Sequence, residues 1–195
     1  MIQHTSDSMQ VVKREEKEVK LTQFVLSEIA AGRVSVDGHW SVIALSMNSP
    51  VIAALRRVVN DLGASDLRIS VILTGRGKHT IADGFENVEA LSVRTGQSSH
   101  LLDAHEQLVL GDVSSWTGDC MRRDPMERDA FETFAANDVE LAAWASKSFA
   151  RLWSGAAPIK VSGHRDRASD TTNIDCVVAG EGNKATTLVA ATSRH

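Results

Sequence analysis

Three polar residues near the middle of the chain have side chains that can do chemistry. His105, Gln107 and Asp112 lie in the stretch 104–112, which reads Ala-His-Glu-Gln-Leu-Val-Leu-Gly-Asp. A histidine can act as a nucleophile or as a general acid or base. A glutamine amide can donate and accept hydrogen bonds. These three residues are therefore the first candidates for a functional site.

The stretch that carries them is predicted to be a β-strand. Alternate side chains of an extended chain share a face, so His105 and Gln107 lie side by side at the start of the strand, where a cleft could open. Residues 108–110 are Leu-Val-Leu, which indicates a strand covered on both faces. Asp112 falls at the far end, at the turn into the next segment.

The spacing resembles the H-x-K-x-x-x-x-D signature of the phospholipase D superfamily. His105 matches the nucleophile position and Asp112 the aspartate position, whereas Gln107 stands where the family has lysine. The family usually continues with G-S-x-N, and the corresponding residues 118–121 are Gly-Asp-Cys-Met, so only the glycine is kept. A helix over about 137–153 follows where the family has a similar closing helix. The resemblance covers roughly residues 35–157.

The resemblance implies phosphodiester chemistry at a shared site. In the family, two copies of the motif meet, one histidine attacks phosphorus, and the other protonates the leaving oxygen. This chain carries one copy, so the resemblance implies a homodimer with an isologous interface. It also makes a phosphate-containing ligand or a nucleic acid the expected partner, and it implies no cofactor.

The missing lysine changes what the site is expected to do. Loss of one preorganised stabilising group costs on the order of 100- to 1,000-fold in rate, and a symmetric dimer loses two. Arg76 and Lys78, in a loop that follows a predicted strand, are candidates to bind phosphate alongside Gln107. The sequence therefore predicts a degenerate domain that binds a phosphorylated ligand or partner with weak or no cleavage.

The elements around this strand predict an α/β domain with a mixed, mostly parallel sheet flanked by helices. Residues 40–45 and 67–73 read as buried strands, and residues 51–62 between them as an amphipathic helix that Gly63 ends. Strand, helix and strand with short connections form a right-handed parallel unit. A further strand is expected at 88–94 and a return strand after Asp112. Residues 131–136 are ambiguous by pattern, and the resemblance makes them an edge strand.

The two ends of the chain differ from this middle part. We expect three regions: a polar segment and helix at 1–32, the α/β domain at 33–158, and a polar tail or small hairpin at 159–195. Residues 9–31 are rich in helix formers, and their charge run at 13–18 indicates either a solvated helix face or a dimer arm. Residues 160–195 contain no aromatic residue.

Composition narrows the class of protein. A charged fraction of 24% and a hydrophobic fraction of 43% are those of an ordinary globular domain. The net charge of -4 argues against a strongly basic nucleic-acid binder, and the lack of tyrosine weakens base stacking. No signal peptide or membrane-length apolar run is evident. We therefore expect no membrane insertion. Two cysteines are too few for a disulfide scaffold and suit a reducing compartment, so we expect a cytoplasmic location.

Three classes of function stay open from the sequence. The first is an active dimeric phosphodiesterase or nuclease that uses His105 as nucleophile. The second is the degenerate binding domain, which Gln107 favours. The third is a structural α/β domain, unrelated to that family, in which His105 is a hydrogen-bonded residue at a strand end. A metal site built from His100, Asp103 and His105 is disfavoured, because nothing places them on one face and no cysteines cluster with them.

Overall fold

The computed structural model describes residues 8–63, 66–75, 85, 88, 90–96, 105–121 and 127–159. All of these belong to one compact unit that extends from Met1 to His164. Arg76, Lys78, His100 and Asp103 lie outside the described residues, as does almost all of the segment 159–195. The region boundaries drawn from the sequence therefore stay predictions.

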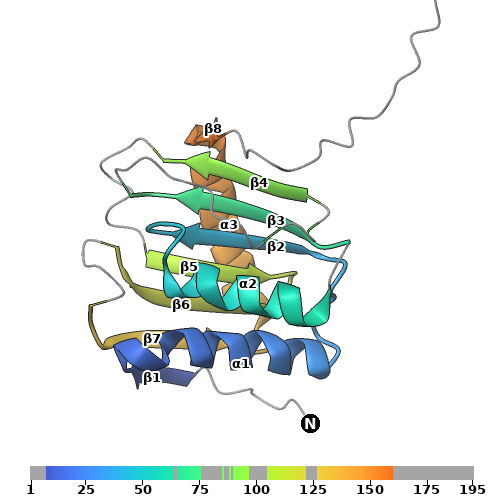
Figure 1. The fold of residues 1–195 in the computed structure, drawn as a ribbon, viewed down its shortest axis with the longest axis vertical. Helices are drawn as coiled ribbons and strands as arrows, with labels where there is room; N and C mark the ends of the chain where they lie inside the picture. Colours follow the sequence, from blue (N-terminus) through green and yellow to red (C-terminus); the bar gives the residue numbers. More distant parts are fainter. Residues whose placement is uncertain are drawn as a thin grey trace, which may run out of the picture. The chain divides into compact units, whose positions relative to one another are not determined.

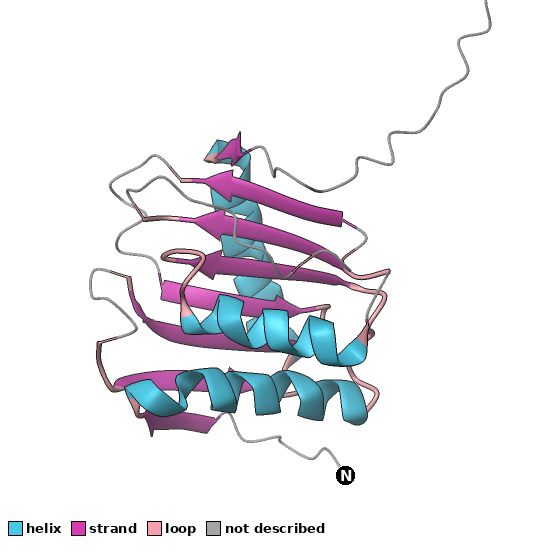
Figure 2. Cartoon of the chain, viewed as in Figure 1, coloured by secondary structure: helices cyan, strands magenta, loops and turns pink. Residues whose placement is uncertain are grey.

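An eight-stranded mixed sheet with helices on both faces forms the framework, which confirms the predicted α/β class (Figures 1 and 2). Its order is β1-β7-β6-β5-β2-β3-β4-β8. The strands are β1 (Ser8–Val12), β2 (His39–Ala44), β3 (Arg68–Leu73), β4 (Ala90–Thr95), β5 (His105–Leu110), β6 (Ser114–Cys120), β7 (Ala130–Ala135) and β8 (Ala157–Ile159). The helices are the short η1 (Arg14–Glu16), α1 (Lys17–Ala30), α2 (Pro50–Leu62) and α3 (Val139–Gly155).

The expectation of a mostly parallel sheet is wrong. Strands β2, β3 and β4 pair in parallel, as the strand–helix–strand pattern predicted. The other pairings that the structure describes are all antiparallel. The reason is the length of the connections: a parallel pair needs a long crossover, whereas β5 and β6 are joined by a tight turn that includes Gly111 at φ 60°. Strands β5, β6 and β7, which follow one another along the chain, therefore form an antiparallel meander.

Helices α1 and α2 cover one face of the sheet, which we call the α1/α2 face, and α3 crosses the other, the α3 face (Figure 1). The sequence explains where α2 begins and ends. Pro50 occupies its first turn, and Gly63 ends it in the left-handed conformation at φ 57°. The residues that α2 buries against the sheet are Pro50, Val51, Ile52, Ala54, Leu55, Val58 and Val59. The helix was predicted one residue shorter.

The N-terminal segment joins the sheet, which the sequence did not predict. Residues 8–12 form strand β1 and pair with β7 in antiparallel register, so the helix begins only at Lys17. Strand β7 consequently lies inside the sheet and is not the edge strand that was expected. The alternation of Met9 and Val11 with Ser8 and Gln10 is a strand signal, but the charged residues at 13–18 that follow it favour a helix in a reading of the sequence alone.

Helix α3 begins as predicted, where the Asp138 carboxylate accepts a 3.0 Å hydrogen bond from the backbone N–H of Leu141. Phe149 packs with Ile43 and Ile72 on the α3 face of the sheet, with Leu152 and Trp153 beside it. Trp144, however, is 62% exposed, so it lies on the solvent side of the helix. No helix in the described ranges is long and apolar enough to cross a membrane.

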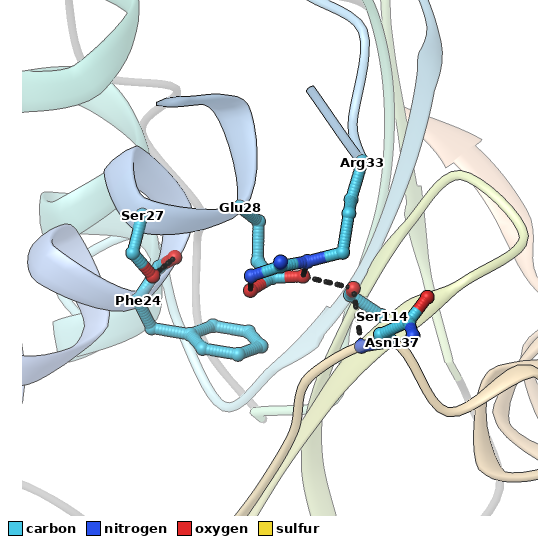
Figure 3. A network of polar contacts seen from close by, with 6 residues as sticks. All are labelled: Phe24, Ser27, Glu28, Arg33, Ser114 and Asn137. Carbon is cyan, nitrogen blue, oxygen red and sulfur yellow. Dashed lines mark hydrogen bonds and ion pairs between the residues drawn. The ribbon is translucent and has the colours of Figure 1, made fainter. Parts of the chain in front are cut away.

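A buried carboxylate ties the end of α1 to the β5–β6 turn (Figure 3). Glu28 is 1% exposed and accepts a hydrogen bond from the Arg33 Nε at 2.9 Å and another from the Ser114 hydroxyl. The backbone N–H of Asn137 donates to the same hydroxyl at 3.2 Å, which links the start of α3 to this group. Burial opposes ionisation of Glu28, but its hydrogen bonds outweigh burial, so its pKa lies below the ordinary value.

Glu28→Gln is predicted to lower the free energy of unfolding by about 1–3 kcal/mol at pH 7, because a buried charged acceptor is lost. A carboxyl whose pKa is lowered by folding contributes stability above its unfolded pKa, and that contribution disappears as the pH falls through its folded pKa. The difference between wild type and variant should therefore shrink below pH 4.5. Urea unfolding from pH 3 to 8 measures it, with Glu18→Gln on the same helix as control. A difference that does not change with pH would contradict the prediction.

Candidate functional site

The direction of β5 decides where the candidate site lies. Strands β2, β3 and β4 run in parallel, so their carboxyl ends meet at one edge of the sheet. Strand β5 runs antiparallel to β2, with Gln107 opposite Ile43. The first residue of β5, His105, therefore lies at the edge where the parallel strands end. Open α/β sheets bind ligands at this edge.

His105 is exposed, and one of its ring nitrogens is held by the neighbouring strand. Its Nδ1 lies 2.9 Å from the carbonyl oxygen of Gly118 on β6. A carbonyl only accepts hydrogen bonds, so Nδ1 carries the proton in the neutral ring, and the lone pair is on Nε2. This tautomer leaves Nε2 able to attack an electrophile or to accept a hydrogen bond.

The acceptor carbonyl belongs to a glycine that packing requires. A Cβ at position 118 would lie 2.6 Å from the ring atoms Cζ2 and Cη2 of Trp116, which is fully buried. The register of β5 and β6 also shifts between His105 and Gln107. Close approach of the Trp116 ring and this irregularity together place the Gly118 carbonyl beside His105.

Gln107 lies two residues from His105 on the same face of β5 but is only 4% exposed. Its paired neighbours are Ile43 on β2 and Thr117 on β6. Ile43 packs against Phe149, so this part of the strand lies beneath α3. The amide is thus next to the site but largely covered.

Asp112 lies at the other end of the strand. It follows Gly111 in the β5–β6 turn and is exposed. Because a strand rises about 3.3 Å per residue, roughly 20 Å separate Asp112 from His105. A single copy of the chain does not bring the two residues together.

A residue that the sequence reasoning missed, Glu106, shapes the edge beside His105. It points to the α1/α2 face and is 2% exposed. Its Oε1 accepts a hydrogen bond from the backbone N–H of Leu45 at 3.1 Å, and it also contacts the Ser49 hydroxyl. The Ser49 Oγ in turn accepts from the backbone N–H of Ser46 at 3.1 Å. Glu106 therefore fixes the connection from β2 to α2.

Burial raises the pKa of Glu106, while the hydrogen bonds from Ser49 and Leu45 and the charge of Lys17 act in the opposite direction. Lys17 itself is buried and lies 3.4 Å from a carboxylate oxygen of Glu132. The signal that could have revealed Glu106 was visible in the sequence, since it is a charged residue in the same alternating row as Leu108 and Leu110.

The structure describes only some of the other residues that the sequence singles out. Arg76 and Lys78 are outside the described residues, although the preceding Gly75 donates a backbone hydrogen bond to the Leu45 carbonyl at 2.8 Å. Cys120 is half-buried, opposite His105 on the neighbouring strand. Across the described ranges, no three His, Cys, Asp or Glu side chains are grouped closely enough to hold a metal ion.

Comparison with solved structures identifies the fold. A phospholipase D family member, Nuc from Salmonella typhimurium, matches over 80% of this chain and 99% of its own, at 16% identity and a TM-score of 0.54. NucT from Helicobacter pylori matches over 79% and 99%, at 12% identity and a TM-score of 0.50. TrmBL2, an archaeal chromatin protein described as having a novel mode of DNA binding, matches over 82% and 57%, at 10% identity and a TM-score of 0.52.

No protein-family model and no curated protein matches the sequence. At these identities the structural likenesses concern the fold. The fold, a mixed sheet flanked by helices, is therefore similar to that of the phospholipase D family member Nuc.

Glu106→Gln is predicted to stabilise the protein at neutral pH. A carboxyl whose pKa is raised by folding costs stability as the pH rises above its unfolded pKa, and the cost is complete above its folded pKa. The amide keeps the shape of the side chain without the charge. The variant should match wild type near pH 4 and become the more stable protein as the pH rises. Urea unfolding across this range tests it, with the exposed Glu15→Gln as control. A variant whose relative stability falls with rising pH would refute the assignment.

Proposed function

We propose that this chain is a degenerate phospholipase D-like domain that binds a phosphate-containing ligand or partner at His105 and cleaves phosphodiesters weakly or not at all. One observation carries the proposal. The ring of His105 is exposed at the ligand-binding edge of an open sheet, and the Gly118 carbonyl holds its Nδ1, which presents Nε2 outward.

Weak phosphodiester cleavage is expected because the residue beside His105 is Gln107. Gln107 carries no charge, and it is 4% exposed beneath α3. A phosphoryl group in the transition state of a displacement is stabilised by cations and aligned donors. A neutral, covered amide supplies less of that stabilisation than a lysine at the same place. The phosphate-binding roles suggested for Gln107, Arg76 and Lys78, and the catalytic role suggested for Asp112, belong to this proposal.

The proposed class of ligand rests on the phosphate group, which nucleic acids and phosphorylated small molecules have in common. A neutral or protonated imidazole hydrogen-bonds phosphate oxygens, whether they belong to a nucleic acid or to a phosphorylated small molecule. TrmBL2, one of the proteins with this fold, is a DNA-binding protein by its description. A short single-stranded oligonucleotide and a simple aryl phosphodiester therefore serve as the two probes.

An active dimeric phosphodiesterase is the second candidate, and the tautomer of His105 favours it. With the proton on Nδ1, Nε2 can form a bond to phosphorus as the leaving oxygen departs. The His105 of a second copy, in its doubly protonated form, would give its Nε2 proton to that oxygen. Water then hydrolyses the phosphohistidine. Hydrolysis of the aryl phosphodiester separates the two candidates.

His105→Ala is predicted to weaken oligonucleotide binding roughly three- to tenfold, because one hydrogen bond to phosphate contributes about 0.5–1.5 kcal/mol. His39→Ala is the matched control, since His39 is also an exposed first residue of a strand but lies at the opposite edge of the sheet. Fluorescence anisotropy measures both. Equal affinity of wild type and His105→Ala would refute the proposed binding site.

The natural protein is predicted to hydrolyse the aryl phosphodiester at or near the uncatalysed rate. Gln107→Lys should raise the rate on the order of 100-fold, because its stem can carry an ammonium from beneath α3 to the edge beside His105. His105→Ala in that background should remove the gain, and Gln107→Met controls for the altered packing. Brisk hydrolysis by the natural protein that His105→Ala abolishes would establish the second candidate instead.

A further inference from the structure

Three serines lie side by side across the parallel strands of the sheet. Ser41 on β2 is paired with Ser70 on β3, and Ser70 is paired with Ser92 on β4. Ser41 lies two residues before Ile43, which packs against α3, so the row of hydroxyls lies on the α3 face. Parallel strands are usually apolar on both faces, so packing alone does not account for three hydroxyls in one row.

Helix α3 leaves part of this row accessible. Ser41 is buried, Ser70 is half-buried and Ser92 is exposed. The helix packs on these strands two residues further along, at Ile43 and Ile72. In Figure 1 it passes behind β3 and β4 near their arrowheads, so the beginnings of these strands lie beside the helix. A small molecule can therefore reach Ser70 from the α3 side.

The hydroxyl of Ser70 is held by an imidazole. His39 is the first residue of β2, and its Nε2 lies 2.8 Å from the Ser70 Oγ. When the neutral ring carries its proton on Nδ1, Nε2 accepts the hydrogen bond from the hydroxyl. In this arrangement a histidine can remove the proton of a serine while the serine oxygen attacks an electrophile.

A guanidinium stands next to this pair. Arg68 is paired with His39 across β2 and β3, and it is exposed. Partial burial of the imidazole, and then the charge of Arg68, lower the pKa of His39 below its ordinary value. The ring is therefore neutral at pH 7 and can accept a proton. The guanidinium, two residues before Ser70 on the same strand, can donate to a negative oxygen that forms beside Ser70.

We propose that Ser70 and His39 form a nucleophile–base pair that hydrolyses a small carboxylic ester, with Arg68 stabilising the negative charge on the carbonyl oxygen. A small ester is the expected class of substrate, because Ser70 is half-buried and α3 stands beside it. The pair lies at the beginnings of β2 and β3, at the opposite edge of the sheet from His105. The inference therefore goes beyond the proposed function and does not depend on it.

The reaction proceeds in two steps. The Ser70 Oγ forms a bond to the carbonyl carbon while its proton passes to the His39 Nε2. The bond from that carbon to the alcohol oxygen then breaks, and the departing oxygen takes the proton, which leaves the acyl group on Ser70. In the second step water gives a proton to Nε2 and attacks the acyl carbon. The Ser70 oxygen leaves and takes this proton back, so the products are a carboxylic acid and an alcohol.

A purely structural role for the hydrogen bond is the alternative. The contact joins the beginnings of β2 and β3, and it would stabilise their pairing by about 0.5–1.5 kcal/mol. Such a role predicts that substitution of His39 lowers stability, and it predicts no reactivity of Ser70. Chemical labelling of the hydroxyl therefore separates the two roles.

Acetylation by p-nitrophenyl acetate tests the pair. The full chain at pH 7 should acquire an acetyl group on Ser70, located by mass spectrometry of its peptides, as p-nitrophenolate is released. Ser70→Ala should remove this acetylation. His39→Gln keeps a polar side chain without a base and should slow it on the order of 100-fold or more. Arg68→Met should slow it roughly tenfold, less than loss of a preorganised donor, because Arg68 is exposed.

Ser92→Ala is the matched control. Ser92 belongs to the same row and is exposed, but it lies one strand further from His39. Its substitution should leave the acetylation rate of Ser70 unchanged, and Ser92 itself should stay unacetylated in the natural protein. Urea unfolding of each variant shows that the fold is kept.

Three results would overturn the inference. Acetylation spread over lysines and histidines without preference for Ser70 would show ordinary surface reactivity. Equal rates for Ser70 and Ser92 would show that the imidazole does not activate the hydroxyl. An unchanged rate in a His39→Gln variant that is folded but less stable would assign the hydrogen bond a structural role.

Discussion

The antiparallel pairing of β5 with β2 is the constraint on which the rest of this domain depends. It joins the parallel strands β2, β3 and β4 to the antiparallel strands β5, β6, β7 and β1. Because the direction reverses there, the start of β5 meets the ends of β2, β3 and β4 at one edge. The same pairing sends Leu108 and Leu110 into the core under α1 and α2, and His105 out of it. Position in the sheet, rather than any local motif, makes His105 a candidate.

Much of the fold could be predicted because its signals are local. Pro50 and Gly63 mark the ends of α2, Asp138 caps α3, and strands β2, β3 and β5 fall where continuous apolar runs stand. What failed depends on long-range contacts. Strand β1 is too short to outweigh the helix formers after it, and it exists by pairing with β7, far away in the sequence. Trp144 fits a helical apolar stripe equally well whether it faces the sheet or solvent.

The sequence could predict where His105 and Gln107 lie on their strand, but not which side chains cover or surround them. Alternation along β5 placed His105 and Gln107 on one face, and the structure has them there. That Gln107 is covered depends on how α3 crosses the sheet, which no single stretch of sequence encodes. Burial of Glu106 and of the Lys17–Glu132 pair likewise depends on how α1 and α2 pack over the sheet. Buried charges of this kind are costly unless they are paired, so they are recognised only once their partners are known.

Packing alone explains why residue 118 is a glycine. The Trp116 ring fills the space that any side chain at 118 would need, so folding alone selects against every replacement. Met121, where the resemblance expects asparagine, is 3% exposed and packs with Ile43 and Ile72. Packing therefore restricts position 118 to glycine and makes position 121 part of the core. An asparagine at 121 would replace a sulfur that accepts a 3.0 Å hydrogen bond from the Thr74 hydroxyl, and it would place the rest of its amide among apolar side chains, which costs stability. The glycine at 118 and the methionine at 121 are therefore both explained by the packing of the fold.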